Sequence, residues 1–239
     1  MEYNPNALPV LISLGCISVL VTILSIATTL KYFQKRTRIA LALSCGVYFT
    51  ALAIIVTFVG EFDWFLSQYF SHEPYFYLYR RPFGYTFLGL AVLSFVWFSV
   101  QVFSWKRKYL WINVAIVIVM LIMVYYPYTW FAQVAPGGAL LRTLTRAVIF
   151  LYSSTTITRI GINAVFAAKR ASTDVIRKNF IDIATAMFTL LLGFIFYLFD
   201  VLASVILGWD YNVFAWLNWW CIGIGLYFLY RGFYTRSVT

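Results

Sequence analysis

Runs of twenty or more apolar residues recur along the whole of this 239-residue sequence. A helix of about 20 apolar residues is long enough to cross the hydrocarbon core of a bilayer. Hydrophobic residues make up 63% of the chain and charged residues 11%, which is too little charge for the surface of a soluble domain of this size. We therefore predict an all-α fold, a seven-transmembrane-helix bundle that forms one integral membrane domain over residues 1–239. The expected spans are approximately 7–32, 39–60, 83–105, 109–131, 141–168, 180–207 and 213–234.

The basic residues indicate how this bundle is oriented. Lysine and arginine gather after the first, third, fifth and seventh spans, and short cytoplasmic connections of membrane proteins carry such an excess. We therefore expect the amino terminus outside and the carboxyl terminus inside, in the cell membrane. The opening MEYNPNALP lacks the basic residues of a signal peptide, so the first span is expected to remain. The net charge of +10 then reflects topology and contact with the lipid bilayer, and no nucleic acid partner is expected.

The fifth span, 141–168, carries three arginines in an otherwise apolar segment. At 100° per residue, Arg142, Arg146, Ser153 and Thr156 fall within about 80° of one another, and Arg159 lies on the border of this stripe. A bare charge at the centre of a bilayer costs at least about 3 kcal/mol. The stripe is therefore expected to face protein or water, not lipid.

An acidic residue in the sixth span offers a partner for the stripe. Asp200 is about seven residues from the outer end of its span, which matches the depth of Arg146 better than that of Arg159. We predict an Arg146–Asp200 ion pair and a polar cavity that opens outward and suits a small anionic ligand. The alternative is an ion pair that only fixes packing, or a contact to a neighbouring subunit. The candidate ligand-binding residues are Arg142, Arg146, Arg159, Asp200, Asn218, Tyr125 and Tyr126.

The outer aromatic loop, 61–82, contains more tryptophan, tyrosine and phenylalanine than an interfacial belt requires. It is predicted to form a short interfacial helix or hairpin over the outer mouth of the bundle, as a lid or a docking surface.

Several site chemistries are not expected. His72 is the only histidine, so the paired histidines of a b-type haem and multi-histidine metal sites are absent from the sequence. The few carboxylates are scattered, and there is no phosphate-binding glycine loop or serine nucleophile elbow. We therefore expect no haem, no metal, no catalytic residues and no enzymatic activity.

The seven-span outline resembles that of microbial rhodopsins, and the seventh span, LNWWCIGIGLYFLYR, has a glycine-rich inner half similar to theirs. The sixth and seventh spans contain no lysine, and Cys221 or Ile222 occupies the place of the retinal lysine, which excludes a covalently bound retinal. The outline also resembles the seven-helix sensory regions that precede histidine kinases, and seven-helix sugar transporters.

These observations favour a non-enzymatic, receptor-like or sensory membrane protein. Its outward cavity is expected to bind a ligand, and its short basic inner loops are expected to contact a membrane or cytoplasmic protein partner. Two alternatives remain open, an accessory subunit of a larger membrane complex and a small-solute or ion carrier.

Overall fold

The computed structural model describes residues 7–70, 76, 79–125, 138–208 and 212–235. These residues form seven long α-helices followed by one π-helical turn. The elements are α1 (Ala7–Lys35), α2 (Arg38–Phe70), α3 (Arg80–Val102), α4 (Lys108–Tyr125), α5 (Gly138–Arg170), α6 (Asp174–Leu207), α7 (Val213–Tyr230) and η2 (Arg231–Thr235).

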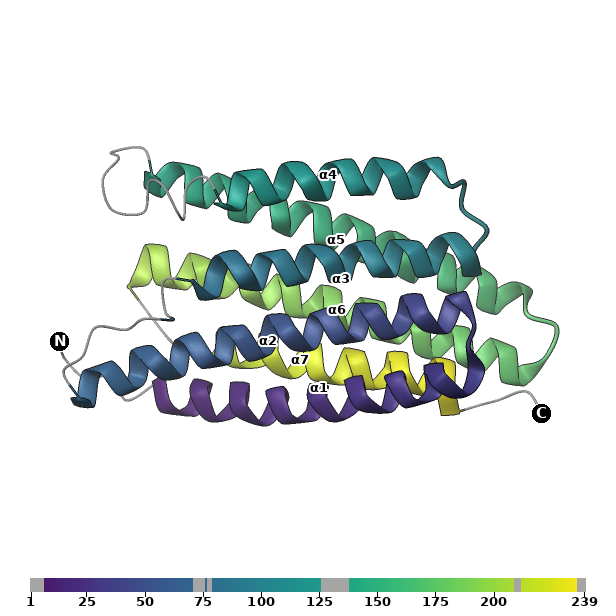
Figure 1. The fold of residues 1–239 in the computed structure, drawn as a ribbon, viewed down its shortest axis with the longest axis horizontal. Coiled ribbons are helices and arrows are strands. Elements are labelled where there is room, and N and C mark those ends of the chain that lie inside the picture. The colour runs from purple at the N-terminus through teal and green to yellow at the C-terminus, as the bar shows by residue number, and fades with distance from the viewer. Residues whose placement is uncertain (1–6, 71–75, 77–78, 126–137, 209–211, 236–239) are drawn as a thin grey trace.

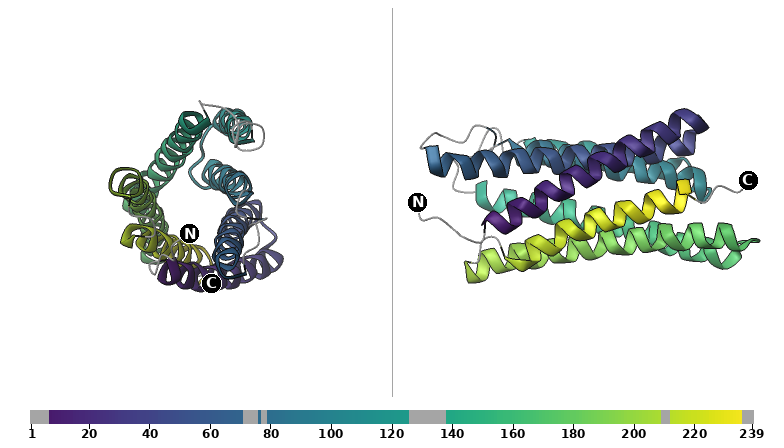
Figure 2. Two further views of the ribbon diagram at one scale, coloured as in Figure 1. Left: turned by 90° about the vertical axis from the view of Figure 1, so that its left-hand side faces the viewer. Right: turned by 90° about the horizontal axis from the view of Figure 1, so that it is seen from below.

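The helices lie side by side in alternating directions (Figure 1). They follow one another in chain order around a ring, which α7 closes by packing against α1 (Figure 2). We call the end of the bundle at which α1, α3, α5 and α7 begin the N-side, and the end at which they finish the C-side. Contacts are most extensive within α1–α3 and within α5–α7, whereas α4 packs mainly on α3 and little on α5. The ring therefore consists of two groups of helices, α1–α4 and α5–α7.

The main apolar core lies between these groups and is concentrated toward the C-side. Its fully buried side chains include Leu43, Ile160, Met187 and Leu229, from four different helices. The core members from α5 and α6 all come from the C-side halves of those helices. A second, smaller cluster of Met120, Val124 and Ile149 joins α4 to α5.

Among the described helices, six are long and apolar enough to cross a bilayer, which makes the chain a multi-pass membrane protein. The remaining helix, α5, is 33 residues long and is less apolar because it carries four arginines, one lysine and a run of hydroxyl side chains. It nevertheless lies alongside the others in the bundle (Figure 1).

The expected spans agree with the helices to within a turn except at the start of α6 and at one end of α2. The sixth span was expected to begin at residue 180, but α6 begins six residues earlier, at Asp174, because Thr173 caps the helix there. The second span was expected to end near residue 60, but α2 continues for about three further turns to Phe70. The first part of the predicted outer loop is therefore a continuous extension of α2, and residues 71–75 and 77–78 of that loop lie outside the described part of the chain. The last part of the fourth expected span, 126–131, also lies outside it.

Local hydrogen bonds define several helix ends. The side chain of Thr173 accepts from the backbone N–H of Ile176 at the start of α6, and Thr37 accepts from Ala40 at the start of α2. Gly208 ends α6 with φ of +66°, a left-handed conformation that glycine adopts without steric cost. These residues allow short connections between antiparallel neighbours.

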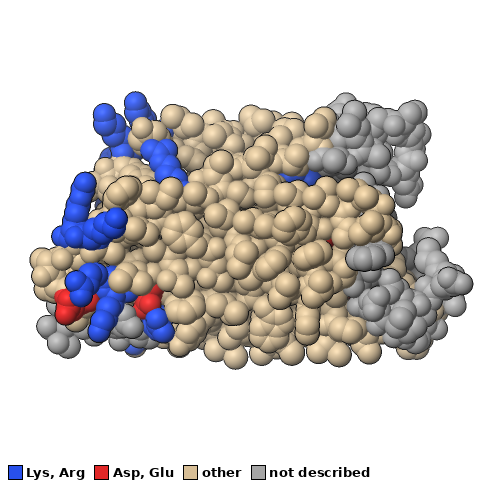
Figure 3. Space-filling model, turned by 180° about the vertical axis from the view of Figure 1, so that it is seen from behind, with Lys and Arg blue, Asp and Glu red and all other residues tan. Residues whose placement is uncertain are grey.

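Lysine and arginine gather at one end of the molecule in the view of Figure 3. In the sequence these cations flank the α1–α2, α3–α4 and α5–α6 connections and follow α7, which all lie at the C-side. The basic residues of the C-side include Lys35, Arg36, Arg38, Lys106, Arg107, Lys108, Lys169, Arg170, Arg177, Lys178 and Arg231.

Candidate functional site

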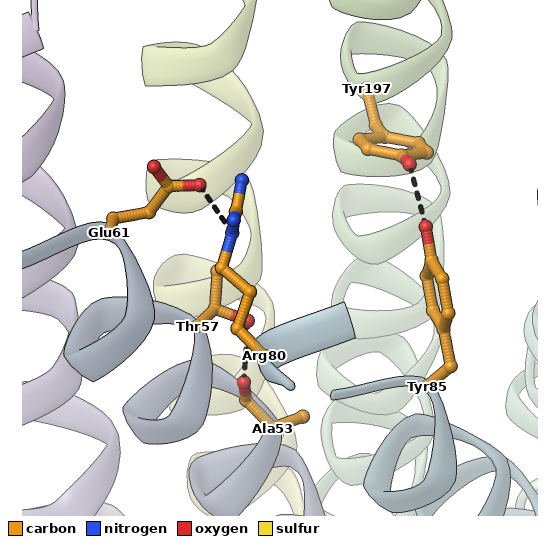
Figure 4. Close-up of polar contacts among 6 residues, drawn as sticks. All are labelled: Ala53, Thr57, Glu61, Arg80, Tyr85 and Tyr197. Atoms are coloured by element: carbon orange, nitrogen blue, oxygen red, sulfur yellow. Dashed lines mark hydrogen bonds and ion pairs between the residues drawn. The ribbon is translucent and has the colours of Figure 1, made fainter. Parts of the chain in front are cut away.

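A pair of tyrosines joins the two groups of helices in the N-side half of the ring. Tyr85 lies in the second turn of α3 and Tyr197 lies near the N-side end of α6. Their hydroxyl oxygens are 3.2 Å apart, within hydrogen-bond distance, and point toward each other (Figure 4). Each phenolic hydroxyl can donate and accept, so this pair can exchange its partner for a polar ligand.

Further polar contacts join α3, α4 and α5. Thr86 Oγ1 is 3.1 Å from the hydroxyl of Tyr125, which links α3 to the last residue of α4. Tyr152 of α5 donates to the Asn113 side chain of α4 at 2.8 Å. Tyr85, Tyr125 and Tyr152 also pack on the small apolar cluster between α4 and α5. Of the predicted site residues, Tyr125 is therefore part of this polar and aromatic layer.

Asp200 lies one turn beyond Tyr197 on α6, and its carboxylate accepts a hydrogen bond of 2.9 Å from the side chain of Asn212. Asn212 also caps α7, because its side-chain oxygen accepts from the backbone N–H groups of Phe214 at 2.9 Å and Ala215 at 3.4 Å. Asp200 therefore helps to fix the start of α7. Asn218 lies one turn further along α7 and is 6% exposed, facing α6 near Gly193.

The register of α5 on α6 brings Arg146 to the depth of Asp200. The rings of Phe150 and Phe194 are in contact at 6.2 Å, and Gly161 lies against Met187. Counting from either contact at 1.5 Å per residue, Arg146 and Asp200 lie within about 3 Å of the same level along the helix axes. The ion pair between them stays a prediction. Arg146 is half-buried and takes part in polar contacts.

The polar stripe of α5 lies largely on the face that is directed into the bundle. Thr145 and Ser153 are both fully buried, and Thr145 donates to the carbonyl oxygen of Met123 at 3.3 Å. The Ser153 hydroxyl has no hydrogen-bond partner in the described part of the chain. A buried hydroxyl without a partner costs about 1–3 kcal/mol, so Ser153 offers an unused polar group below Arg146.

Arg159 lies apart from these residues. It is exposed, and its guanidinium stacks on the rings of Trp105 at 4.5 Å and Tyr109 at 4.8 Å. Both rings flank the α3–α4 connection at the C-side, about 20 Å along α5 from Arg146. The structure thus gives Arg159 aromatic partners at the C-side and does not bring it to the residues around Arg146. Of the other predicted residues, Tyr126 and the side chain of Arg142 lie outside the described part of the chain.

Sequence reasoning did not find the buried ion pair between α2 and α3. Arg80, in the first turn of α3, has only 7% of its side chain exposed, and its Nε lies 2.9 Å from the carboxylate of Glu61 (Figure 4). Gly60 permits this approach, since a Cβ on that residue would be 2.5 Å from the Cβ of Arg80. The signal was hidden because residues 61–82 were interpreted as a loop, in which Arg80 would be solvated.

A second ion pair, at the C-side, was also missed. Arg231 at the start of η2 binds both carboxylate oxygens of Asp182 on α6, with Nε to Oδ2 at 3.0 Å. Asp182 is 3% exposed. The available signal was an acidic residue inside the apolar sixth span, level with an arginine at the end of the seventh.

Comparison of this chain with known proteins does not assign it to a family. No protein-family model, no curated protein and no solved structure matches this chain. Within the described residues, no group of three or more histidine, cysteine, aspartate or glutamate side chains is arranged to hold a metal ion.

Proposed function

We propose that this chain is a non-enzymatic, receptor-like membrane protein with seven spans, which binds a small anionic or hydrogen-bonding ligand in the N-side half of its bundle. The observation that carries the proposal is the Tyr85–Tyr197 hydroxyl pair, which joins the two groups of helices at the level of Arg146 and Asp200. A ligand that competes for these hydroxyls changes the contact between α3 and α6. This change in the relative position of α3 and α6 transmits the effect of ligand binding to the C-side of the bundle.

The distribution of polar and apolar side chains supports a site on the N-side. The main core is concentrated toward the C-side, so a rigid base lies below the polar layer. The layer combines one cation, one carboxylate, phenolic hydroxyls and the unpartnered Ser153 hydroxyl. An arginine held among neutral donors in a poorly hydrated space binds carboxylate or phosphate groups with charge-assisted hydrogen bonds.

The charge distribution supports an orientation with the C-side in the cytoplasm. The cations of the C-side flank short connections, as the positive-inside rule requires of cytoplasmic loops. The ligand site then faces the outside of the cell membrane. The basic C-side connections provide the contact surface for a cytoplasmic or membrane partner with acidic groups.

The ligand-binding proposal is tested by thermal unfolding of the purified full-length protein in detergent. Sodium acetate, succinate, phosphate and sulfate are compared at constant ionic strength. A ligand present at 100 times its Kd stabilises the folded state by about 2.7 kcal/mol. We expect at least one anion to raise the unfolding temperature of the wild type and of the control Arg107→Gln, but not of Arg146→Gln. If no anion stabilises the wild type, or if Arg146→Gln responds equally, the proposal is wrong.

The accessory-subunit alternative is favoured by the surface of α4. This helix contacts the bundle mainly through α3, and its apolar side chains Trp111 and Ile122 are 70% and 64% exposed. If a second membrane protein covers α4, purification from native membranes yields a stoichiometric complex. Recovery of the chain as a single species argues against this alternative.

The carrier alternative is favoured by the division of the ring into α1–α4 and α5–α7. Two groups with a thin contact between α4 and α5 can move against each other. A carrier takes up radiolabelled substrate into liposomes, and an anion identified by thermal unfolding is the first substrate to test. Binding without uptake supports the receptor.

A further inference from the structure

A groove runs along the outer surface of α5 and α6, starting at the C-side. It has a volume of 610 Å³, which is within the range of about 300–1,000 Å³ typical of ligand sites. Its lining is mainly apolar, with two threonines, Thr185 and Thr189, on α6, and its charged residues, Lys169 and Arg177, lie at the C-side end. Neither residue belongs to the ligand site proposed above.

The walls and floor of the groove are suited to a hydrocarbon chain. Ala168 and Ala184 are small and nearly fully buried, so the surface is recessed between the two helices. Ile181, Phe188 and Leu192, all on α6, form the exposed apolar part of the lining.

Their exposed fractions are 47% for Ile181, 41% for Phe188 and 43% for Leu192, so all three side chains are open to the acyl region of a bilayer. From Ile181 to Leu192 the helix rises by about 16 Å, at 1.5 Å per residue. One leaflet of a hydrocarbon core of about 30 Å is about 15 Å thick. The apolar part of the groove therefore has the length of one acyl chain.

The charged end of the groove lies where the headgroup of such a lipid would be. Lys169 lies in the last turn of α5 and Arg177 lies in the first turn of α6, and both are exposed. Arg177 is paired with Asp174 at 2.8 Å, but the two side chains are 55% and 76% exposed. An exposed pair of this kind is weak, so a phosphate group can share the guanidinium. Arg170 and Lys178, next to these residues in the sequence, add further positive charge at the same end.

We propose that this groove is a binding site for one acidic phospholipid of the leaflet that faces the C-side, with the phosphate between Lys169 and Arg177 and an acyl chain along α6. Basic pockets between membrane helices bind anionic headgroups in this way. A zwitterionic lipid of the same chain length fits the apolar part but lacks the net negative charge that the two cations select. The site sits on the connection between α5 and α6, so an acidic lipid there holds these two helices together.

The experiment uses the full-length protein, delipidated in detergent and titrated with phosphatidylglycerol or with phosphatidylcholine of the same acyl chains, and bound lipid is counted by native mass spectrometry. We expect one phosphatidylglycerol to bind the wild type more tightly than phosphatidylcholine. In Lys169→Gln/Arg177→Gln its affinity should fall about 30-fold, the equivalent of two basic side chains at about 1 kcal/mol each. The control Lys106→Gln/Arg107→Gln removes the same charge from another exposed C-side connection and should keep the wild-type affinity.

A second variant tests the groove without changing its charges. Thr185→Trp fills the groove about halfway along its apolar part, between Ile181 and Leu192, and should also reduce phosphatidylglycerol binding. Equal binding of the two lipids by the wild type would overturn the proposal, as would equal losses in the two double variants or full binding by Thr185→Trp. Displacement of the lipid by inorganic phosphate at millimolar concentration would identify a phosphate site in place of a lipid site, and would also overturn it.

Discussion

The buried ion pair between Asp182 and Arg231 is expected to respond asymmetrically to removal of its partners. The side chain of Asp182 is 5% exposed, whereas the side chain of Arg231 is 35% exposed. Two hydrogen bonds join them, from Nε to Oδ2 and from Nη2 to Oδ1. The pair connects η2 to α6, so it fixes η2 against the C-side of the bundle.

The loss in the free energy of unfolding depends on which charged group remains without its partner after the substitution. Arg231→Gln leaves a buried carboxylate without its counter-charge, which typically costs about 3–5 kcal/mol. Asp182→Asn leaves a guanidinium that already reaches solvent and can turn toward it. The loss is then close to that of hydrogen bonds to a charged group, about 1.5–3 kcal/mol. Arg231→Gln should therefore lower the free energy of unfolding more than Asp182→Asn does.

The measurement is an SDS titration of the full-length protein in mixed micelles, followed by the fluorescence of its nine tryptophans. The double variant should cost less than the sum of the two single variants, because the interaction can be lost only once. The reasoning is refuted if Asp182→Asn is as costly as Arg231→Gln, or if the two effects add.

Four further variants, one of them a matched control, test other contacts by the same titration. Tyr85→Phe removes the hydroxyl pair that joins α3 to α6 and should cost about 0.5–1.5 kcal/mol; an unchanged free energy of unfolding would mean that the pair does not form. Gly60→Ala should cost about 1–3 kcal/mol, because its Cβ would lie 2.5 Å from the Cβ of Arg80, whereas Gly84→Ala meets nothing closer than 3.4 Å and should be nearly neutral. Equal effects of the two alanines would contradict this packing. Asn212→Ala removes the cap of α7 and should cost about 1–2 kcal/mol, and a loss below about 0.5 kcal/mol would contradict the capping role.

The helices could be predicted from the sequence because apolar runs and basic connections are local signals. The expected boundaries agree with the structure at the start of α1 (Ala7), the end of α6 (Leu207) and the start of α7 (Val213). The extension of α2 to Phe70 could not be predicted in this way. Its last turns mix acidic and aromatic residues, and the same composition suits an interfacial loop.

The candidate site was only partly predictable, for a similar reason. Depth along a helix follows from residue number, so Arg146 and Asp200 could be matched before the structure was known. The partner across the ring depends on which helices are neighbours and how they are rotated. The Tyr85–Tyr197 pair and the stacking of Arg159 on Trp105 are contacts of this kind. They required the three-dimensional arrangement of α3, α5 and α6.

The account rests on a polar site that opens to the outside at the N-side, and cysteine accessibility tests this most directly. Cys16, Cys45 and Cys221 are first replaced by alanine. Tyr197→Cys then places a thiol in the polar layer, and Leu198→Cys places one at the same depth on a side chain that is 39% exposed toward lipid. Intact cells are treated with a membrane-impermeant thiosulfonate, which requires a hydrated thiolate. The account predicts reaction at Tyr197→Cys and none at Leu198→Cys; no reaction at either position, or equal reaction at both, would contradict it.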